Sequence, residues 1–201
     1  FALLSLCHTV RVDKPSIHLS GAAQDYSDTG MEYEYQSSSP DEKAFVEACR
    51  RYGIVYHGIR DGEQEITFKG KMKRYKQLHV LEFDPTRKRM SVIVKFENGD
   101  VYLMCKGAES AILDRVVSGE KAATLQHVNE FASLGLRTLV LAQRKLSQKD
   151  IALFDSKLQE ARTALQNREE KLAETFDFLE DELHVLGATA VEDKLQEDVP
   201  K

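Results

Sequence analysis

Residues 90–106 read MSVIVKFENGDVYLMCK and contain the clearest structural signal in the chain. Apolar residues recur at every second position over 90–96, which is the period of a β-strand. A second strand-like run, 101–106, follows Asn98-Gly99, a dipeptide typical of two-residue hairpin turns. Ile93 adds an apolar side chain on the other face, so we expect the first strand to be buried on both faces. The stretch therefore predicts a central hairpin.

Other strand-like and helix-like segments extend outward from this hairpin. Asp61-Gly62 is a second hairpin signal, between strands predicted over 54–59 and 65–68. Further strands are predicted over 78–83, 137–143 and 185–189, and helices over 40–52, 108–116, 122–134 and 147–183. Because hairpin-forming strands alternate with inserted helices, the sequence predicts an α+β fold with a mostly antiparallel, twisted sheet flanked by helices.

The helix expected over 40–52 has clear signals at both ends. Ser39 suits the N-cap and Pro40 the first helical position, while Gly53 suits the end. Glu42 comes three residues after Ser39, and this spacing predicts a capping box. The preceding residues 14–39 contain many serines and few residues of the kind that are buried, so we interpret them as an exposed, flexible loop.

The composition is that of a folded, acidic protein. Hydrophobic residues make up 42% of the 201 residues, which excludes disorder as the dominant state. The formal net charge of −5 argues against a general nucleic-acid-binding protein. No stretch approaches the roughly 18–20 apolar residues that span a bilayer. The chain has no initiator Met, and we interpret it as a piece of a longer protein.

Several common catalytic and metal-binding motifs are absent from the sequence. It has no Walker A loop and no GxGxxG, and its six histidines are scattered and form no Ser/His/Asp set. Cys7, Cys49 and Cys105 are odd in number and far apart, and no CxxC or HxxxH spacing occurs. We therefore expect buried free thiols in a reducing compartment, and no metal site.

Two local features near strand and helix ends could contact a planar anionic ligand. Ser39-Pro40-Asp41-Glu42 is a helix cap, and a ligand role would also require Glu42 to point outward. Phe83 ends a strand and is followed by three successive cations at 87–89. A ring beside cations suits stacking on a base and contact with phosphates, and suits equally a core phenylalanine beside a solvated turn.

Two more features lie further along the chain. Lys106-Gly107 ends a strand just before a helix N-terminus, which favours a nearby anion; the alternative is an exposed lysine in an ordinary loop. Arg137 enters an apolar strand just after Gly135. A charge in such a strand either faces a cleft or forms a structural ion pair.

Taken in order, these features resemble the nucleotide-binding domain of P-type ATPases, and specifically the type IV branch, the phospholipid flippases. The resemblance covers essentially the whole chain and is carried by CHTV (7–10), SPDE-x-A (39–44), F-x-x-x-RKRMSV (83–92), KGA-x-S (106–110), GLRTL (135–139) and GATAVEDKLQ (187–196). Residues 164–171 look like the animal subgroup that is associated with aminophospholipids, particularly phosphatidylserine. The resemblance implies a nucleotide-binding domain over 1–186 and the start of a return segment into the phosphorylation domain over 187–201.

The resemblance also implies an ATP site. Phe83 would stack on the adenine ring, and Lys106 would lie deep in the adenine and ribose pocket. Glu42 would reach the adenine side, Lys88 would be a second pocket lysine, and Arg137 would lie near the phosphates. The remaining implied contacts, beside these, are Ser91, Gly107 and Thr138.

The intact enzyme implied by the resemblance would hold ATP and Mg²⁺ and pass the γ-phosphate to an aspartate in a DKTGT motif on its phosphorylation domain, so moving aminophospholipid to the cytoplasmic leaflet. That motif and all membrane helices are missing here, so we expect this chain to bind ATP without turnover and to hold no catalytic residue. The implied partners are the phosphorylation and actuator domains of the same protein and an accessory β-subunit that binds the membrane region, with no nucleic acid. The implied location is the cytosolic side of the plasma membrane or of endosomal or Golgi membranes.

Two alternatives stay open at this point. The loop over 14–39 and the charged helix over 148–183 would suit a non-enzymatic regulatory or interaction module. Another P-type ATPase branch, such as a cation pump, is the second alternative; the wording RKRMSV and GATAVEDKLQ argues against it.

Overall fold

The computed structural model describes residues 1–13 and 34–192. The chain divides into two compact units. The first unit comprises Phe1–Val80 and Val92–Val101, and the second comprises Leu81–Ser91 and Tyr102–Lys201. Most of the loop predicted over 14–39 lies outside the described residues.

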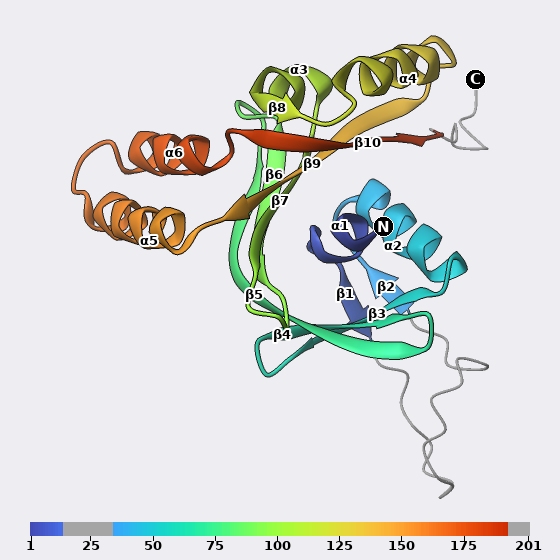
Figure 1. Cartoon of the computed structure of the whole chain (residues 1–201), viewed down its shortest axis with the longest axis horizontal. Helices are drawn as coiled ribbons and strands as arrows, with labels where there is room; N and C mark the ends of the chain where they lie inside the picture. Colours follow the sequence, from blue (N-terminus) through green and yellow to red (C-terminus); the bar gives the residue numbers. More distant parts are fainter. Residues whose placement is uncertain (14–33, 193–201) are drawn as a thin grey trace, which may run out of the picture. The chain divides into compact units, whose positions relative to one another are not determined.

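The first unit is built from short helices and a set of antiparallel strands (Figure 1). Its elements are α1 (Ala2–Leu6), β1 (Arg11–Asp13), β2 (Glu34–Gln36), α2 (Pro40–Arg51), β3 (Ile54–Arg60), β4 (Glu63–Phe68), most of β5 (Lys71–Asp84) and the later residues of β6 (Arg89–Lys95). The strand β2 corrects the loop expected through residue 39, because it pairs with β1 and its central Tyr35 is only 2% exposed.

Two hairpins of the first unit are closed by two-residue turns. Asp61 and Gly62 have φ values of 53° and 79°, the left-handed conformation that the Asp-Gly signal predicts. Lys69 and Gly70, at 48° and 77°, close a second hairpin that we did not predict. Lysine is an unusual residue for the first of these positions, so this turn has no clear sequence signal.

Helix α2 begins and ends as the sequence predicts, but its capping box is incomplete. The Ser39 side chain accepts from the backbone N–H of Glu42 at 3.4 Å. The reciprocal bond is replaced, because the N–H of Ser39 donates to Ser37 Oγ at 3.1 Å. The Glu42 carboxylate instead accepts from residue Thr9, more than thirty positions away. The predicted capping box is wrong because the Glu42 carboxylate forms this tertiary contact instead of accepting from the Ser39 N–H.

The second unit contains the remaining strands and four helices. Its elements are the first residues of β6 (Arg89–Lys95), β7 (Val101–Gly107) beyond its first residue, α3 (Glu109–Ile112), the short 3₁₀ helix Leu113–Arg115, β8 (Val116–Ser118), α4 (Lys121–Ser133), β9 (Arg137–Leu146), α5 (Gln148–Thr163), α6 (Arg168–Leu179) and β10 (Leu183–Val191). The residue we expect to start the return segment, Gly187, follows a bulge inside β10.

The eight strands β3 to β10 follow the order β3-β4-β5-β6-β7-β9-β10-β8 in one sheet. The pairs β3/β4, β4/β5 and β9/β10 are antiparallel, and β10/β8 is parallel. The α+β prediction with a mostly antiparallel sheet is therefore confirmed. The expected two-sided burial of the central strand is also confirmed, since Ile93 is 1% exposed and every β6 residue before Lys95 is buried.

The long helix predicted over 147–183 is two helices. It breaks at 164–167, where Asn167 takes the left-handed φ of 53°, and α5 and α6 then lie side by side (Figure 1). Ring centroids of Phe154 and Phe176 lie 6.4 Å apart between the two helices. The sequence prediction failed because residues on both sides of the break favour helix.

Each unit has its own apolar core. Leu6, Val46 and Ile66 are at most 2% exposed in the first unit, as are Ile112, Val140 and Phe154 in the second. Cys7, Cys49 and Cys105 are buried thiols outside any disulfide bond, as we predicted. Burial raises the pKa of the Cys49 thiol, which keeps it protonated and unreactive.

Candidate functional site

Gly107 shows which way the residues of β7 point. A Cβ atom added to Gly107 would lie 2.6 Å from Arg89 Cβ and 2.6 Å from the carbonyl oxygen of Lys88. Gly107 therefore packs against the start of β6, on the face where the Arg89 side chain emerges. Because side chains alternate along a strand, the preceding residue Lys106 points to the opposite face.

The Lys106 face continues onto the neighbouring strand β9. Tyr102 shares this face by alternation, and the Lys145 ammonium lies 5.9 Å from the Tyr102 ring centroid. Counting back along β9 in steps of two from Lys145 leads to Arg137, which is exposed. The second unit thus presents Lys106 and Arg137 on one face of the sheet, whereas Thr138 points to the other.

Phe83 belongs to the same set. It is the penultimate residue of β5 and is 63% exposed, which excludes the alternative of a core phenylalanine. From the turn over 85–88, which the Lys88 N–H closes on the Asp84 carbonyl, we infer that Asp84 lies opposite Arg89 and Phe83 opposite Met90, on the other face from Arg89. Lys106, in contrast, is only 6% exposed. The face offers an open aromatic ring, a buried cation and an exposed cation.

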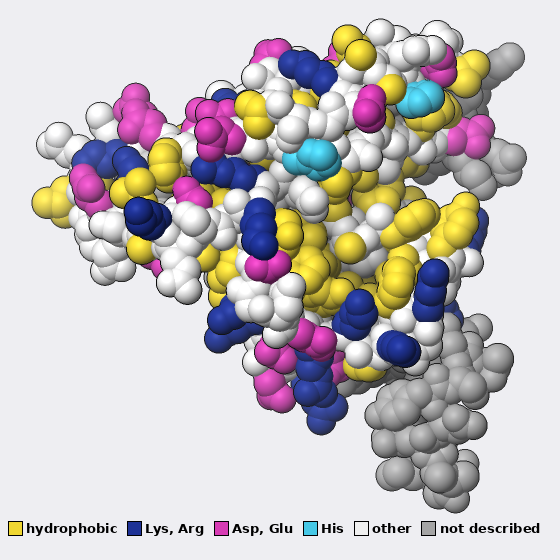
Figure 2. All heavy atoms as spheres, in the orientation of Figure 1, with side chains coloured by type: hydrophobic (Ala, Val, Ile, Leu, Met, Phe, Trp, Pro, Cys, Tyr) yellow, Lys and Arg dark blue, Asp and Glu magenta, His cyan; other side chains and the backbone are white. Residues whose placement is uncertain are grey.

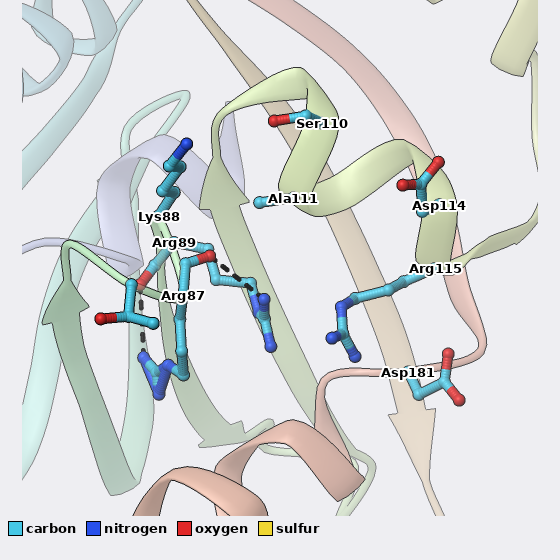
Figure 3. Close-up of a pocket in the computed structure, with 9 residues that line it drawn as sticks. Arg87, Lys88, Arg89, Ser110, Ala111, Asp114, Arg115 and Asp181 are labelled. Atoms are coloured by element: carbon cyan, nitrogen blue, oxygen red, sulfur yellow. Dashed lines mark hydrogen bonds between the residues drawn. The ribbon is translucent and has the colours of Figure 1, made fainter.

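Lys88 occupies the tight turn between these strands. Its φ is 54°, its N–H donates to the Asp84 carbonyl at 2.7 Å, and its own carbonyl accepts from Ala108 N–H at 3.0 Å. Figure 3 shows its side chain pointing away from the guanidinium groups of Arg87 and Arg89. These backbone bonds fix the turn and leave the Lys88 side chain exposed.

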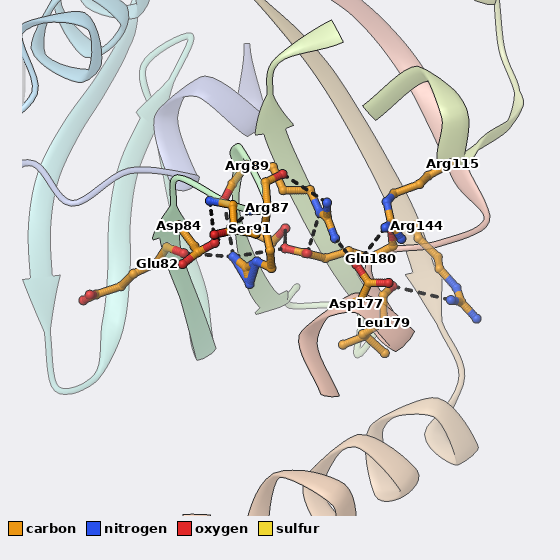
Figure 4. A network of polar contacts seen from close by, with 11 residues as sticks. Glu82, Asp84, Arg87, Arg89, Ser91, Arg115, Arg144, Asp177, Leu179 and Glu180 are labelled. Atoms are coloured by element: carbon orange, nitrogen blue, oxygen red, sulfur yellow. Dashed lines mark hydrogen bonds and ion pairs between the residues drawn. The ribbon is translucent and has the colours of Figure 1, made fainter. Parts of the chain in front are cut away.

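The two arginines that flank Lys88 are structural. Arg87 and Arg89 are 8% and 3% exposed. Arg89 Nε donates to Glu180 Oε2 at 2.6 Å, and Arg89 Nη2 donates to Asp177 Oδ1 at 2.5 Å (Figure 4). Arg87 donates to the Glu82 carbonyl at 2.9 Å and lies 5.1 Å from the Phe176 ring centroid. The interpretation of 87–89 as three solvated cations is therefore wrong for two of them.

Ser91 belongs to this buried network. Its hydroxyl donates to Glu180 Oε1 at 2.6 Å, and the residue has no solvent exposure. Arg115 completes the cluster by donating to Asp177 Oδ1 at 2.7 Å. The cluster fastens the C-terminal end of α6 to the start of β6.

The ion pairs of this cluster shift the pKa values of Asp177 and Arg89. Burial alone would raise the pKa of Asp177, but the hydrogen bonds and charges of Arg89 and Arg115 outweigh it and hold that pKa below its usual range. Burial alone would likewise lower the pKa of Arg89, yet Glu180 and Asp177 raise it. Asp177 therefore stays ionised and Arg89 stays charged at neutral pH.

A pocket of about 530 Å³ lies beside the Lys88 turn within the second unit (Figure 3). Its lining residues are Thr86, Arg87, Lys88, Arg89, Ser110, Ala111, Asp114, Arg115 and Asp181. The mixture of cations and carboxylates makes it strongly polar. Its cations Arg87, Arg89 and Arg115 are engaged by backbone carbonyls and by the carboxylates of Asp177 and Glu180, so the pocket offers Lys88 as its exposed cation.

Glu42 lies in the first unit and does not point outward. The residue is 7% exposed, and its Oε2 accepts from Thr9 N–H at 2.9 Å and from Thr9 Oγ1 at 2.8 Å. Ser37 Oγ donates to the same oxygen at 3.5 Å. These contacts tie the start of α2 to the segment before β1, so the condition we set for a ligand role is not met in this arrangement.

The functional residues that sequence reasoning missed are Arg115, Asp177 and Glu180. Glu180 is fully buried although glutamate is usually exposed, and its partner Arg89 lies 91 residues away. No local pattern marks such a pair. Over the described ranges, no group of three or more His, Cys, Asp or Glu side chains is placed to hold a metal ion.

The helices within 1–13 and 34–192 include none that is long and apolar enough to cross a membrane. A family model described as "P-type ATPase, cytoplasmic domain N" matches residues 16–198. Human phospholipid-transporting ATPase IG is 44% identical over 195 residues, and human phospholipid-transporting ATPase IH is 44% identical over 198 residues. These alignments cover 96% and 98% of this chain.

A fungal relative is similar over the same length. Phospholipid-transporting ATPase DNF1 of Chaetomium thermophilum is 41% identical over 201 residues, which is 98% of this chain and 12% of that protein. The chain spans 17% of the length of each of the two human relatives. Because the family model matches nearly all of the sequence, the resemblance is confirmed at the level of the family: the chain belongs to the cytoplasmic N domains of P-type ATPases.

Proposed function

We propose that this chain is the ATP-binding domain of a phospholipid-transporting ATPase. The observation that carries the proposal is the shared sheet face of Phe83, Lys106 and Arg137, which combines an open ring with two cations. A purine stacks on such a ring, and charge-assisted bonds hold its phosphates. The names of the relatives support phospholipid as the transported substrate of the intact protein.

Each of the three residues has a distinct task in this proposal. Phe83 stacks on adenine because its ring is 63% exposed at a strand end. Lys106 contacts the base and ribose from a buried position, where a cation interacts more strongly than in water. Arg137 approaches the phosphates, for which its forked guanidinium is well suited. Lys88 adds a second, exposed cation from the adjacent turn.

The remaining residues that the resemblance implies contribute less to the proposed ATP site. Ser91 and Gly107 support the site from behind, since the first is hydrogen-bonded to Glu180 and the second packs on the Lys88 turn. Thr138 lies on the opposite face from Arg137. Glu42 lies in the first unit with its carboxylate bound to Thr9, so the proposal does not depend on it.

The proposed chemistry of the intact protein is phosphoryl transfer, which depends mainly on positioning and charge neutralisation. This domain would hold the nucleotide while an aspartate on a neighbouring domain accepts the γ-phosphate. Residues 187–201 would begin the return to that domain. This chain's contact with the phosphates is assigned to Arg137, with Lys88 as a second cation, and Mg²⁺ would accompany the nucleotide. The membranes would be the plasma membrane, endosomes or Golgi, with an accessory β-subunit bound outside this domain.

An NMR titration of ATP into the 201-residue chain tests the site. Phe83→Ala and Arg137→Ala should each weaken ATP binding about tenfold, the loss expected for one stacking or charge-assisted contact. Matched controls are Val117→Ala, which removes another exposed apolar side chain, and Arg162→Ala, which removes another exposed arginine. Unchanged affinity in both Phe83→Ala and Arg137→Ala would overturn the assigned face. Sustained ATP turnover by the chain alone would contradict transfer to an aspartate elsewhere.

A further inference from the structure

The first unit carries a cationic and apolar surface that the nucleotide site does not use. We call it the hairpin patch, and its members are Arg51, Tyr52, Phe68, Lys69, Lys71 and Lys73. In Figure 2, Lys and Arg side chains border hydrophobic side chains in the region of β3–β5. The patch brings cations and large apolar side chains together on an acidic chain of net charge −5.

Backbone bonds make the hairpin patch one continuous surface. The N–H of Lys69 donates to the Gly53 carbonyl at 3.2 Å, which joins the β4–β5 turn to the end of α2. Phe68 pairs with Ile54 on one side and with Lys71 on the other. The residues around Tyr52 and those of the hairpin are therefore held next to each other by the sheet itself.

The lysines of the patch lack the acidic neighbours that balance the rest of β5. Arg74 lies 3.0 Å from Glu65, and Lys76 pairs across the strands with Glu63. Lys71 and Lys73 instead face Phe68 and Ile66. Among residues 1–13 and 34–192, no carboxylate lies within 4.0 Å of Lys69, Lys71 or Lys73. The positive charge is thus concentrated at one end of the hairpin.

The apolar members of the patch are partly open to solvent. Tyr52 is 70% exposed and Phe68 38%. The ammonium groups of Lys69 and Lys73 lie 5.7 Å and 5.4 Å from the Phe68 ring centroid. Such cation–π contacts hold the two lysines over the ring, so the charged surface is partly organised before any partner arrives.

We propose that the hairpin patch docks an acidic peptide segment that also carries apolar side chains. Lys71 and Lys73 lie two residues apart on β5 and therefore project to the same face, about 7 Å apart. Carboxylates at alternate positions of an extended peptide have the same spacing. Phe68, the cross-strand partner of Lys71, then offers area for an apolar side chain on the same face, and the opposite charge fixes the orientation of the segment.

A bilayer fits the patch less well than a peptide. Membrane docking of this kind requires an apolar face that reaches about 5–10 Å into the headgroup and acyl boundary. Phe68 sits beneath two lysines, and its strand neighbour Ile66 is 2% exposed and belongs to the core. The ring cannot protrude far from the sheet, whereas a peptide needs only a shallow surface.

The test is fluorescence anisotropy on the 201-residue chain with a labelled probe peptide of alternating Glu, with Phe and Ala between. Wild type should bind saturably at low salt and more weakly as salt screens the charges. Lys69→Glu/Lys71→Glu/Lys73→Glu should weaken binding at least about tenfold, as three modest surface charge pairs imply. The matched control, Lys121→Glu/Lys149→Glu/Lys171→Glu, changes the net charge equally at exposed sites and should change binding less than about twofold.

Two outcomes would overturn the proposal. Equal losses in the two triple variants, with both shown to be folded by circular dichroism, would mean that the peptide responds only to net charge. Binding of wild type to vesicles containing about 30% phosphatidylserine, without binding to the peptide, would assign the patch to a membrane. A probe in which Gln replaces every Glu should fail to bind in either case.

Discussion

Arg89 and Glu180 form a buried ion pair, with 2.6 Å between Nε and Oε2 and side-chain exposures of 4% and 0%. The pair joins the first residue of β6 to the residue that follows α6. Ser91 binds the second carboxylate oxygen at 2.6 Å, so both oxygens of Glu180 have partners. These partners offset the free-energy cost of burying the Glu180 charge. Because Arg89 directly follows Lys88, the pair also fixes the position of the Lys88 turn relative to the C-terminal end of α6.

Replacing Glu180 should destabilise the second unit strongly. Glu180→Gln keeps the volume but leaves the buried Arg89 charge with only the half-exposed Asp177 as an ionic partner. Breaking one side of a buried pair typically costs about 3–5 kcal/mol, and we expect a loss near the lower end. Urea denaturation followed by circular dichroism measures it. Glu169→Gln, at an exposed position in the first turn of α6, should stay within about 0.5 kcal/mol of wild type.

Lowering the pH should reduce the folding stability of the chain partly through protonation of Asp177. Its pKa is lowered in the folded state, so the stability it contributes is present above the unfolded pKa of about 3.9 and is lost as pH falls through the folded value. Asp177→Asn should therefore lower the melting temperature at pH 7. Below about pH 3.9 the gap to wild type should narrow. A gap that stays constant down to about pH 2.5 would contradict the assigned pKa shift. Glu174→Gln, at an exposed position of α6, is the control.

Replacing the neighbouring cations Arg87 and Lys88 should affect different properties. The first change should lower folding stability, and the second should lower ATP affinity. Arg87→Ala removes a buried side chain that donates to the Glu82 carbonyl and contacts Phe176, so it should cost about 2–3 kcal/mol of folding stability. Lys88→Ala should change stability by less than about 0.5 kcal/mol because its side chain is exposed. ATP affinity should fall in Lys88→Ala. Thermal melting and ATP titration of both variants separate the two effects. Equal losses of stability would show that Arg87 and Lys88 do not divide into a structural and a ligand-binding residue.

The sequence predicted the elements whose signals are local. The Asp61-Gly62 turn and the Ser39 cap depend on residues close to them in the chain. The shared face of Lys106 and Arg137 also follows from strand periodicity, once the order of the strands is known.

The roles of Arg87, Arg89 and Glu42 could not be predicted, because their partners are distant in sequence. Arg89 meets Glu180 across 91 positions, and Glu42 meets Thr9 across 33. Three consecutive cations look alike in a sequence, yet the sheet turns two of them inward. The break at Asn167 was hidden for another reason, since the left-handed conformation of one residue decides it and the flanking residues favour helix.

The contact of Gly107 with the Lys88 turn gives the last prediction. In Gly107→Ala the new methyl group would lie 2.6 Å from the Lys88 carbonyl oxygen and 2.8 Å from Arg89 Cα, and these are backbone atoms that cannot rotate away. Overpacking of this kind costs about 1–3 kcal/mol, and β7 must shift relative to the turn. Since Lys106 precedes Gly107, we expect weaker ATP binding together with a lower melting temperature. Ser156→Ala, at an exposed position of α5, should change neither. An unchanged melting temperature in Gly107→Ala would mean that the strand and the turn are not in the close contact from which the orientation of Lys106 is inferred.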